Sequence, residues 1–169
     1  LPDISPVCPG ETVALTVLSG QPNDPGIVYT WTGGLAAGMA NGTSTGLNPQ
    51  IPAFTAALPE GVYPVSVTAS LQNCSATRVF NIVIRDDQAP QFTNCPDNMI
   101  LVGNDPDNCS ARVNWTPLAA TDDCAGNVTI LQTAGLASGS VFPVGTAQIM
   151  YTATDQSGNS STCSFSIVV

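Results

Sequence analysis

The chain has 169 residues, of which 43% are hydrophobic and 9% are charged, and its formal net charge at pH 7 is −9. It contains no histidine and no lysine, which excludes Ser-His-Asp and Cys-His catalysis, zinc sites that use imidazole, and lysine Schiff bases. So acidic a chain is also a poor partner for nucleic acid, and no membrane insertion is expected because no run of about 18 apolar residues occurs.

Strand patterns dominate both halves of the chain, and no segment has the apolar spacing of a helix. Strands are predicted, in chain order, at 12–18, 27–32, 51–56, 63–69, 78–84, 111–115, 147–153 and 163–169, and all of these except 27–32 and 51–56 alternate apolar and polar residues. The polar segment 19–26, SGQPNDPG, is expected to be a turn between the first two of these strands. Fifteen glycines and fourteen prolines interrupt the chain, which suits a sandwich of short strands and disfavours helices.

Two aromatic residues of the first half fit known positions of an immunoglobulin-like sandwich. Trp31 lies where such a sandwich keeps a core tryptophan, so we expect it in the core and not as a ligand platform. Tyr63 follows a Pro-Glu-Gly turn and is expected to form a tyrosine corner. The segment 33–46, rich in small residues, is expected to be either a surface loop or a contact surface for a neighbouring subunit.

The segment 85–90, RDDQAP, is short, acidic and ends in proline, as expected for a semi-rigid linker. It divides the chain into two domains, 1–86 and 87–169, each of a size that suits a small β domain. We therefore predict an all-β protein made of two tandem immunoglobulin-like β-sandwich domains.

Six cysteines without a CxxC pair favour disulfides in an oxidising compartment over a zinc ribbon. The two halves place cysteines alike, because a CP dipeptide precedes the first strands and a cysteine opens each terminal strand. This weak repeat predicts three disulfides: Cys8–Cys74, Cys95–Cys163 and, from the remaining residues, Cys109–Cys124.

The ends of the chain extend the same pattern. If SFSIVV at the C-terminus preceded LPDISPVCPG at the N-terminus, the junction would repeat the order seen around the linker: apolar strand, Asp, Pro and CP. The chain also begins without methionine, as expected of a processed product or an excised fragment. We expect it to be one period of a tandem or head-to-tail array.

Several blocks in the second half follow a recognisable order. They are Asp87 and Pro90, Cys95-Pro96, VNWTP at 113–117, DDC at 122–124, SGSVFPVGT at 138–146, and YTATDQSGN at 151–159 with CSF at 163–165. On these blocks the second half resembles the hyalin-repeat (HYR) domain. The resemblance implies an immunoglobulin-like sandwich of adhesion and extracellular structural proteins, without catalytic residues. On CPG, TWTGG and GVYPVSVTA alone, the first half resembles PKD and immunoglobulin-like modules of secreted bacterial proteins.

Sandwich topology is expected to gather acidic loops at the pole of the second domain that receives the linker. The residues concerned are Asp86, Asp87, Asp122, Asp123, Asp155 and Asn159. Converging carboxylates raise one another's pKa, and a calcium ion with its roughly six to eight oxygen ligands would relieve the repulsion. The alternative is that Asp155 and Asn159 only shape an Asx turn, while Asp122 and Asp123 are solvated.

The chain also contains sequons for N-glycosylation. They begin at Asn41, Asn73, Asn108, Asn114, Asn127 and Asn159. They are either glycan acceptors, in a host that modifies asparagine, or chance matches in a chain rich in Ser, Thr and Asn.

These features together predict a non-catalytic protein outside the cell or at the cell surface. The leading interpretation is a structural repeat or subunit of a bacterial surface fibre or large adhesin, whose partners are neighbouring copies arranged head to tail. The alternative is an accessory module that binds surface glycans or a protein receptor, which would require an exposed aromatic platform. Aromatic residues make up only 6% of the chain, and both tryptophans lie at expected core positions.

Overall fold

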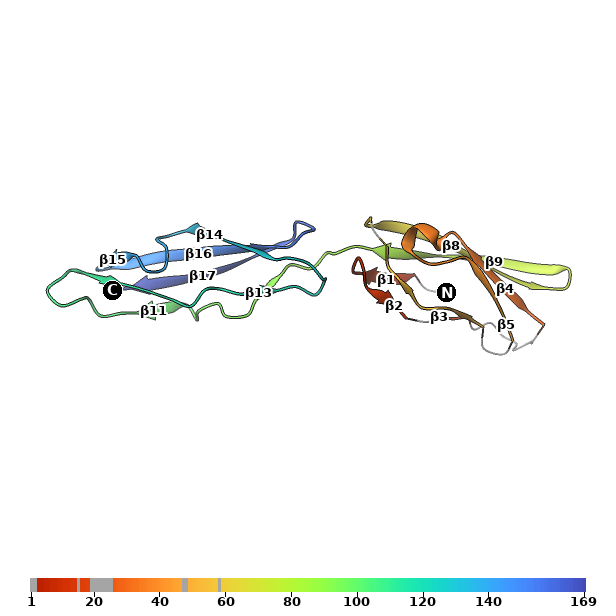
Figure 1. Ribbon diagram of the computed structural model, residues 1–169, viewed down its shortest axis with the longest axis horizontal. Coiled ribbons are helices and arrows are strands. Elements are labelled where there is room, and N and C mark those ends of the chain that lie inside the picture. The colour runs from red at the N-terminus through yellow and green to blue at the C-terminus, as the bar shows by residue number, and fades with distance from the viewer. Residues whose placement is uncertain (1–2, 15, 19–25, 47–48, 58) are drawn as a thin grey trace. The chain divides into compact units, whose positions relative to one another are not determined.

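The computed structural model describes residues 3–14, 16–18, 26–46, 49–57 and 59–169. The chain divides into two compact units, Leu1–Asp86 and Asp87–Val169, the same boundary that the acidic linker predicts (Figure 1). The turn expected at 19–26 lies, apart from Gly26, outside the described residues. Among the described residues, no helix combines the length and the hydropathy needed to cross a membrane.

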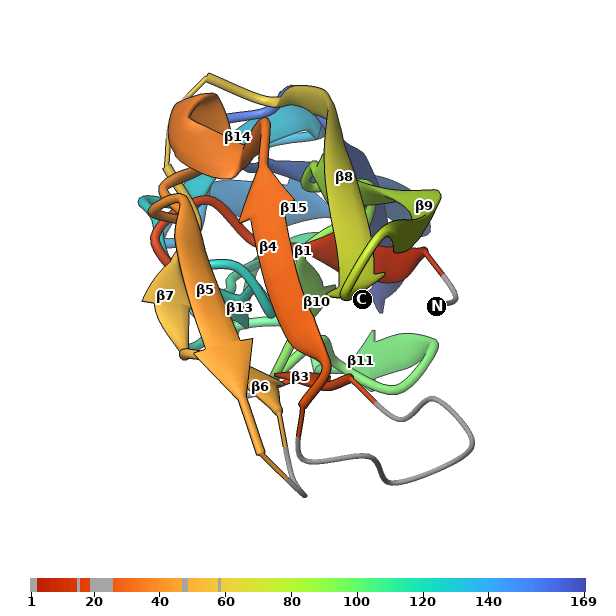
Figure 2. The same cartoon turned by 90° about the vertical axis from the view of Figure 1, so that its right-hand side faces the viewer.

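The first unit is built on a five-stranded sheet in the order β1-β9-β8-β4-β5 (Figure 2). These strands are β1 Ile4–Val7, β9 Cys74–Ile84, β8 Gly61–Leu71, β4 Val28–Thr32 and β5 Gly42–Thr45. Strands β8 and β9 form a long antiparallel hairpin, whereas β1 joins the outer edge of β9 in parallel. Two short antiparallel pairs are β2 Thr12–Val13 with β7 Phe54–Thr55, and β3 Thr16–Val17 with β6 Gln50–Ile51.

The core of the first unit contains Trp31, as its position predicts. Its side chain is 3% exposed, and its Nε1 donates a hydrogen bond to the carbonyl oxygen of Ala40 at 2.8 Å. Ala37 and Met39 are also buried, so the segment 33–46 contributes to the core and is more than a surface loop. Within it lies the 3-10 helix η1, Gly34–Ala37.

Two local features fix the chain around this core. Gly38 ends η1 with φ 89°, and a Cβ atom there would lie 2.1 Å from the carbonyl oxygen of Thr55, so only glycine fits. The hydroxyl of Tyr63 donates to the carbonyl oxygen of Pro59, which confirms the predicted tyrosine corner. The Tyr63 bond ties the residues that precede β8 to that strand.

The second unit has a four-stranded sheet in the order β11-β17-β16-β14. The strands are β11 Met99–Leu101, β17 Ser160–Val168, β16 Thr146–Thr154 and β14 Thr129–Ala134. Two further antiparallel pairs are β10 Gln91–Phe92 with β13 Ala120–Thr121, and β12 Ser110–Arg112 with β15 Val141–Pro143. Strand β11 is parallel to the terminal strand β17, as β1 is to β9, so the two units share one plan.

Aromatic side chains fill the core of the second unit. Phe142 and Phe165 are each 1% exposed, and Trp115 meets both rings edge-on, with centroids 6.2 and 5.5 Å away. The Nε1 of Trp115 donates to the hydroxyl of Tyr151 at 3.2 Å. The half-buried indole therefore packs and hydrogen-bonds within its own unit.

The all-β sandwich predicted from alternation is confirmed, with differences in strand length. Segments 63–69, 78–84, 147–153 and 163–169 lie in β8, β9, β16 and β17, and only the last overruns its strand, by one residue. Segments 12–18 and 51–56 each contain two short strands, and the strand expected at 111–115 ends at Arg112. Beyond Arg112 the backbone bonds to the turn at 138–140 instead of a strand: Val113 N donates to Ser140 O, and Trp115 N donates to the Ser138 hydroxyl.

Candidate functional site

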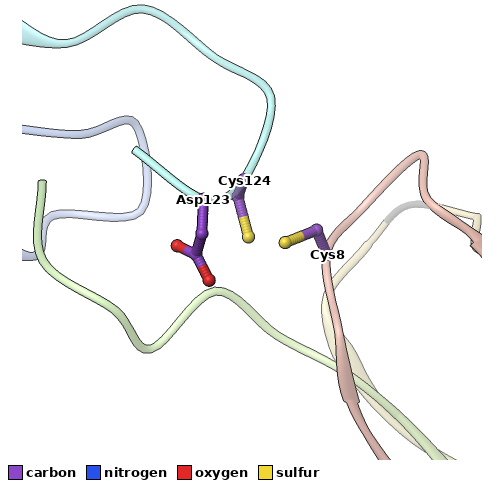
Figure 3. A group of neighbouring side chains, drawn as sticks. All are labelled: Cys8, Asp123 and Cys124. Atoms are coloured by element: carbon purple, nitrogen blue, oxygen red, sulfur yellow. The ribbon is translucent and has the colours of Figure 1, made fainter. Parts of the chain in front are cut away.

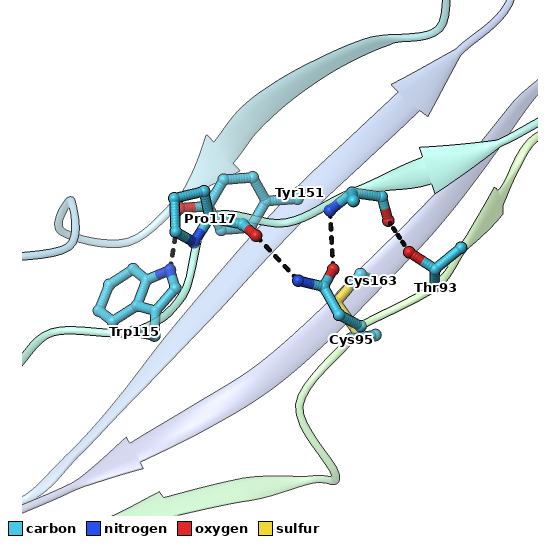
Figure 4. The surroundings of a disulfide bond; sticks show 8 residues. Thr93, Cys95, Trp115, Pro117, Tyr151 and Cys163 are labelled. Atoms are coloured by element: carbon cyan, nitrogen blue, oxygen red, sulfur yellow. Dashed lines mark hydrogen bonds between the residues drawn. A yellow bond between two sulfur atoms is a disulfide. The ribbon is translucent and has the colours of Figure 1, made fainter.

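One predicted disulfide is confirmed, namely Cys95–Cys163 in the second unit. The two Cα atoms are 5.8 Å apart across a sequence separation of 68 residues. The bond ties the segment before β11 to β17, beside Trp115 and Tyr151 (Figure 4). Neighbouring hydrogen bonds run from the Asn94 side chain to Pro117 O and from Ala119 N to Asn94 Oδ1, at 2.8 and 2.7 Å. The disulfide and these bonds fasten the incoming chain to the sheet.

The predicted pairing Cys8–Cys74 is wrong. Cys74 is an exposed free thiol, whereas Cys8 is disulfide-bonded. Register explains the error: Cys74 begins β9 opposite Leu71 at the hairpin tip, while β1 ends at Val7, level with Ile84. Ten residues of extended strand separate the two levels, about 33 Å, whereas a disulfide needs Cα atoms within about 7 Å.

The predicted pairing Cys109–Cys124 is also wrong. Cys109 is an exposed free thiol and Cys124 is disulfide-bonded. Cys109 precedes β12 and its carbonyl oxygen accepts from Val144 N at 3.1 Å, at the end of the unit where β16 begins. Asp123 and Cys124 follow β13, which pairs with β10 at the start of the unit. Figure 3 shows the side chains of Asp123 and Cys124 next to each other.

Asp122, in the loop after β13, has one carboxylate oxygen without a hydrogen-bond partner within the described part of the chain. Asp122 and Asp123 line a cavity of about 390 Å³ together with Gln88, Gln91 and Thr121. Ligand oxygens of the two aspartates lie within 4.8 Å of each other. Asp122 Oδ2 accepts from Cys124 N at 3.2 Å, whereas Oδ1 is buried without a hydrogen-bond partner among the described residues. A buried, unpaired carboxylate oxygen is costly unless a cation or water contacts it.

Asp155 and Asn159, two of the other predicted calcium ligands, are hydrogen-bonded to each other. Asn159 donates its backbone N–H to Asp155 Oδ1 at 2.8 Å and its side-chain amide to Oδ2 at 3.0 Å, which is the Asx-type turn. Within the described residues, no group of three or more acidic or cysteine ligands within 4.8 Å includes Asp155. Asp86 ends the first unit at 9% exposure, and Asp87 Oδ1 accepts from the Gln88 side chain at 2.9 Å.

The sequon asparagines differ in exposure. Asn159 is half-buried, and the other five are exposed: Asn41, Asn73, Asn108, Asn114 and Asn127. Asn41 uses its Oδ1 to accept from Gly33 N at 3.2 Å. Asn73 lies in the hairpin turn before Cys74, and Asn108 lies directly before Cys109.

The first unit contains a groove that is large enough to hold a ligand. It has a volume of about 830 Å³ and lies along β5, with Thr43, Ser44, Gln50 and Phe54 among its lining residues. Trp31 is also a lining residue but is only 3% exposed, so the indole offers no platform for a ligand. The exposed aromatic surface that the ligand-binding alternative requires is missing from this part of the described structure.

Residues 85–169, just over half of the chain, match the HYR domain. The chain belongs to the HYR domain family. This confirms the resemblance in the second half, while the resemblance of the first half to PKD modules stays a prediction. Relatives with similar sequence indicate an extracellular, adhesion-type module.

Two groups of relatives are similar to the HYR half. "Sushi, von Willebrand factor type A, EGF and pentraxin domain-containing protein 1" of Rattus norvegicus is 36% identical over 94 residues, covering 56% of this chain and 3% of that protein. "Sushi repeat-containing protein SRPX2" of Bos taurus is 35% identical over 83 residues, covering 49% of this chain and 18% of that protein. The HYR chain thus spans a small part of the length of these relatives.

Solved structures with similar backbones are more distant in sequence. The Clostridium thermocellum CbhA fibronectin(III)-like modules match 99% of this chain and 90% of their own, at 15% identity and a TM-score of 0.41. Human protocadherin-24 EC1-2 matches 89% of this chain and 84% of its own, at 20% identity and a TM-score of 0.36.

Proposed function

We propose that this HYR protein is a non-catalytic structural repeat or subunit of an extracellular bacterial fibre or large adhesin, whose copies contact one another head to tail. The observation that supports it is the shared plan of the two units. In each, a short strand near the entry of the chain runs parallel to the long terminal strand, β1 with β9 and β11 with β17.

This plan resists pulling. When force acts on the two ends of such a unit, the parallel strands slide past each other, so their hydrogen bonds are loaded in shear and must break together. In the second unit, the Cys95–Cys163 disulfide adds a covalent stop between the same two regions. The absence of lysine removes many trypsin-type cleavage sites, an advantage outside a cell.

Electron microscopy of the native surface material tests this function. We expect filaments, or long surface proteins, that contain this sequence repeatedly, and we expect the purified chain to sediment as oligomers that grow with concentration. A chain that stays monomeric over a thousandfold range of concentration, and occurs in the medium without filaments, would contradict the proposal.

The same proposal includes a calcium ion at the loop after β13. Its support is the buried, unpartnered Oδ1 of Asp122 and the nearby carboxylate of Asp123, hard oxygens of the kind calcium prefers. Cys124 is disulfide-bonded and contributes no thiolate ligand.

Calorimetric titration with calcium checks this site. We expect Asp122→Asn to weaken binding roughly tenfold or more, because the substitution removes a charged ligand. Asp155→Asn is the matched control, since the Asp155 carboxylate is already used by Asn159 in the turn. The site is refuted if the wild-type chain releases no binding heat, or if both variants lose the same affinity.

A glycan- or receptor-binding accessory module is the competing function. The groove along β5 is where such a ligand would rest, but its tryptophan is buried. The structural role therefore has the stronger support.

A further inference from the structure

The end of the β8–β9 hairpin extends beyond the core of the first unit. All residues from 71 to 79 are exposed, although strand neighbours normally alternate between a buried and an exposed face. The core begins only at Phe80, which is 2% exposed. We call residues 69–79 the hairpin arm.

One edge of the arm is open. Strand β1 pairs with β9 only at Ile82 and Ile84, so within the described residues no strand covers β9 from Cys74 to Val79. The backbone N–H of Asn81 points to this edge, because it donates to Asp3 Oδ1 at 2.7 Å. Alternate residues therefore direct their backbone groups to the same open edge. Such an edge can pair with another chain.

A second exposed surface lies in the other unit. The segment 103–109, here called the acidic loop, is exposed throughout and carries Asp105 and Asp107. Its shape is fixed by hydrogen bonds from Asp105 N to Ser110 O at 2.8 Å and from Asn108 N to Asp105 O at 3.0 Å. The loop ends at Cys109, whose thiol is exposed and free.

The arm and the acidic loop are complementary in charge. The arm contains Arg78 and no acidic residue, in a chain whose net charge is −9. Two such chains repel each other over most of their surfaces, so an acid-free surface with an arginine is a favourable contact for the acidic loop of another copy. Each of the two surfaces also carries one free thiol, in the same tripeptide Asn-Cys-Ser.

We propose that the arm of one copy docks on the acidic loop of a second copy, and that Cys74 and Cys109 then form an intermolecular disulfide. This contact rests on the proposed assembly of copies and would join them in a chain, because every copy has both surfaces. The arm and the loop each lie at the end of their unit that is away from the linker segment 85–90.

The bond forms by thiol–disulfide exchange with a small extracellular disulfide RSSR. The Cys74 thiolate attacks one sulfur and releases RS⁻, which leaves a mixed disulfide on Cys74. The Cys109 thiolate of the second copy then attacks Cys74 Sγ and releases the second RS⁻. Two protein thiols are oxidised to one disulfide, RSSR is reduced to two RSH, and the two protons pass from the protein thiols to the released thiolates.

The test treats the full chain with oxidised glutathione and examines it by non-reducing electrophoresis and peptide mass spectrometry. Wild-type protein should give a ladder of multimers linked Cys74–Cys109. Cys74→Ser or Cys109→Ser alone should give nothing longer than a dimer, and a mixture of the two variants should give the mixed dimer. Only Cys74–Cys74 dimers, a bond within one chain, or glutathione adducts alone would overturn the inference.

A charge variant separates docking from random oxidation. Arg78→Gln should slow formation of the Cys74–Cys109 link by about threefold at low salt, whereas Arg85→Gln makes the same charge change outside the arm and should not. Equal rates in the two variants would contradict charge-guided docking.

Light scattering of the double variant C74S/C109S separates failure of this inference from failure of the proposed function. Oligomers that form without the disulfide would leave the proposed function standing. If no variant and no wild-type chain formed oligomers, both the inference and the proposed function would be wrong.

Discussion

Replacing Cys95 and Cys163 together by alanine is expected to lower the free energy of unfolding of the second unit by about 4 kcal/mol. The disulfide closes a loop with a sequence separation of 68 residues, and the loss of chain entropy in the unfolded state grows with loop length. Small domains have a total stability of only about 5–15 kcal/mol, so this one bond supplies a large part of it.

Urea unfolding followed by Trp115 fluorescence measures the effect. The chain has two tryptophans, so a Trp31→Phe background leaves Trp115, which belongs to the second unit, as the reporter. The control is C109A, which removes an exposed free thiol from the same unit and should change the stability by less than about 0.5 kcal/mol. A loss below about 1 kcal/mol in C95A/C163A would show that the bond restrains little.

The second large effect is expected for Trp31→Ala, which should destabilise the first unit by about 3–5 kcal/mol. The indole is 3% exposed, and its removal leaves a cavity and the Ala40 carbonyl oxygen without its donor. The ring fits closely against its neighbours, because a Cβ atom on Gly42 would lie 2.5 Å from the Trp31 ring.

Hydrogen exchange of the β8 and β9 amides, measured by mass spectrometry, reports on this unit alone. Protection should fall by roughly two to three and a half orders of magnitude in Trp31→Ala, since about 1.4 kcal/mol corresponds to tenfold. Trp31→Phe should fall between this variant and the wild type, because it keeps most of the packing. Leu35→Ala, at a side chain that is 65% exposed in the same unit, should have little effect. If Trp31→Ala and Leu35→Ala behaved alike, the core role of Trp31 would be wrong.

Much of the fold could be predicted because its signals are local. Alternation placed four of the longest strand segments, and the tyrosine corner and core tryptophan followed from residue type and position. The strands β1, β5, β10, β11, β13, β14 and β15 were missed. All but β14 have two to four residues, too few for a period to stand out, whereas β14 has six and was overlooked.

The cysteine assignment shows where local pattern fails. Cys74 and Cys163 are both expected to open a terminal strand, yet Cys163 is the fourth residue of β17, opposite Tyr151, and Cys74 is the first residue of β9, opposite Leu71. Similar sequence motifs thus lie at different levels of the two hairpins. The level depends on where each hairpin turns, and that is a property of strand pairing.

The sequence by itself determined the strand content, the division at the acidic linker, the HYR membership and the exclusion of histidine and lysine chemistry. These depend on composition, on spacing along the chain and on short motifs. Only the tertiary structure decided which cysteines stay free, that the Asp155 carboxylate is used by Asn159, and that the end of the β8–β9 hairpin extends past its core. Each of these depends on which residues meet across strands, and hydrophobic periodicity fixes the face of a residue but not its partner.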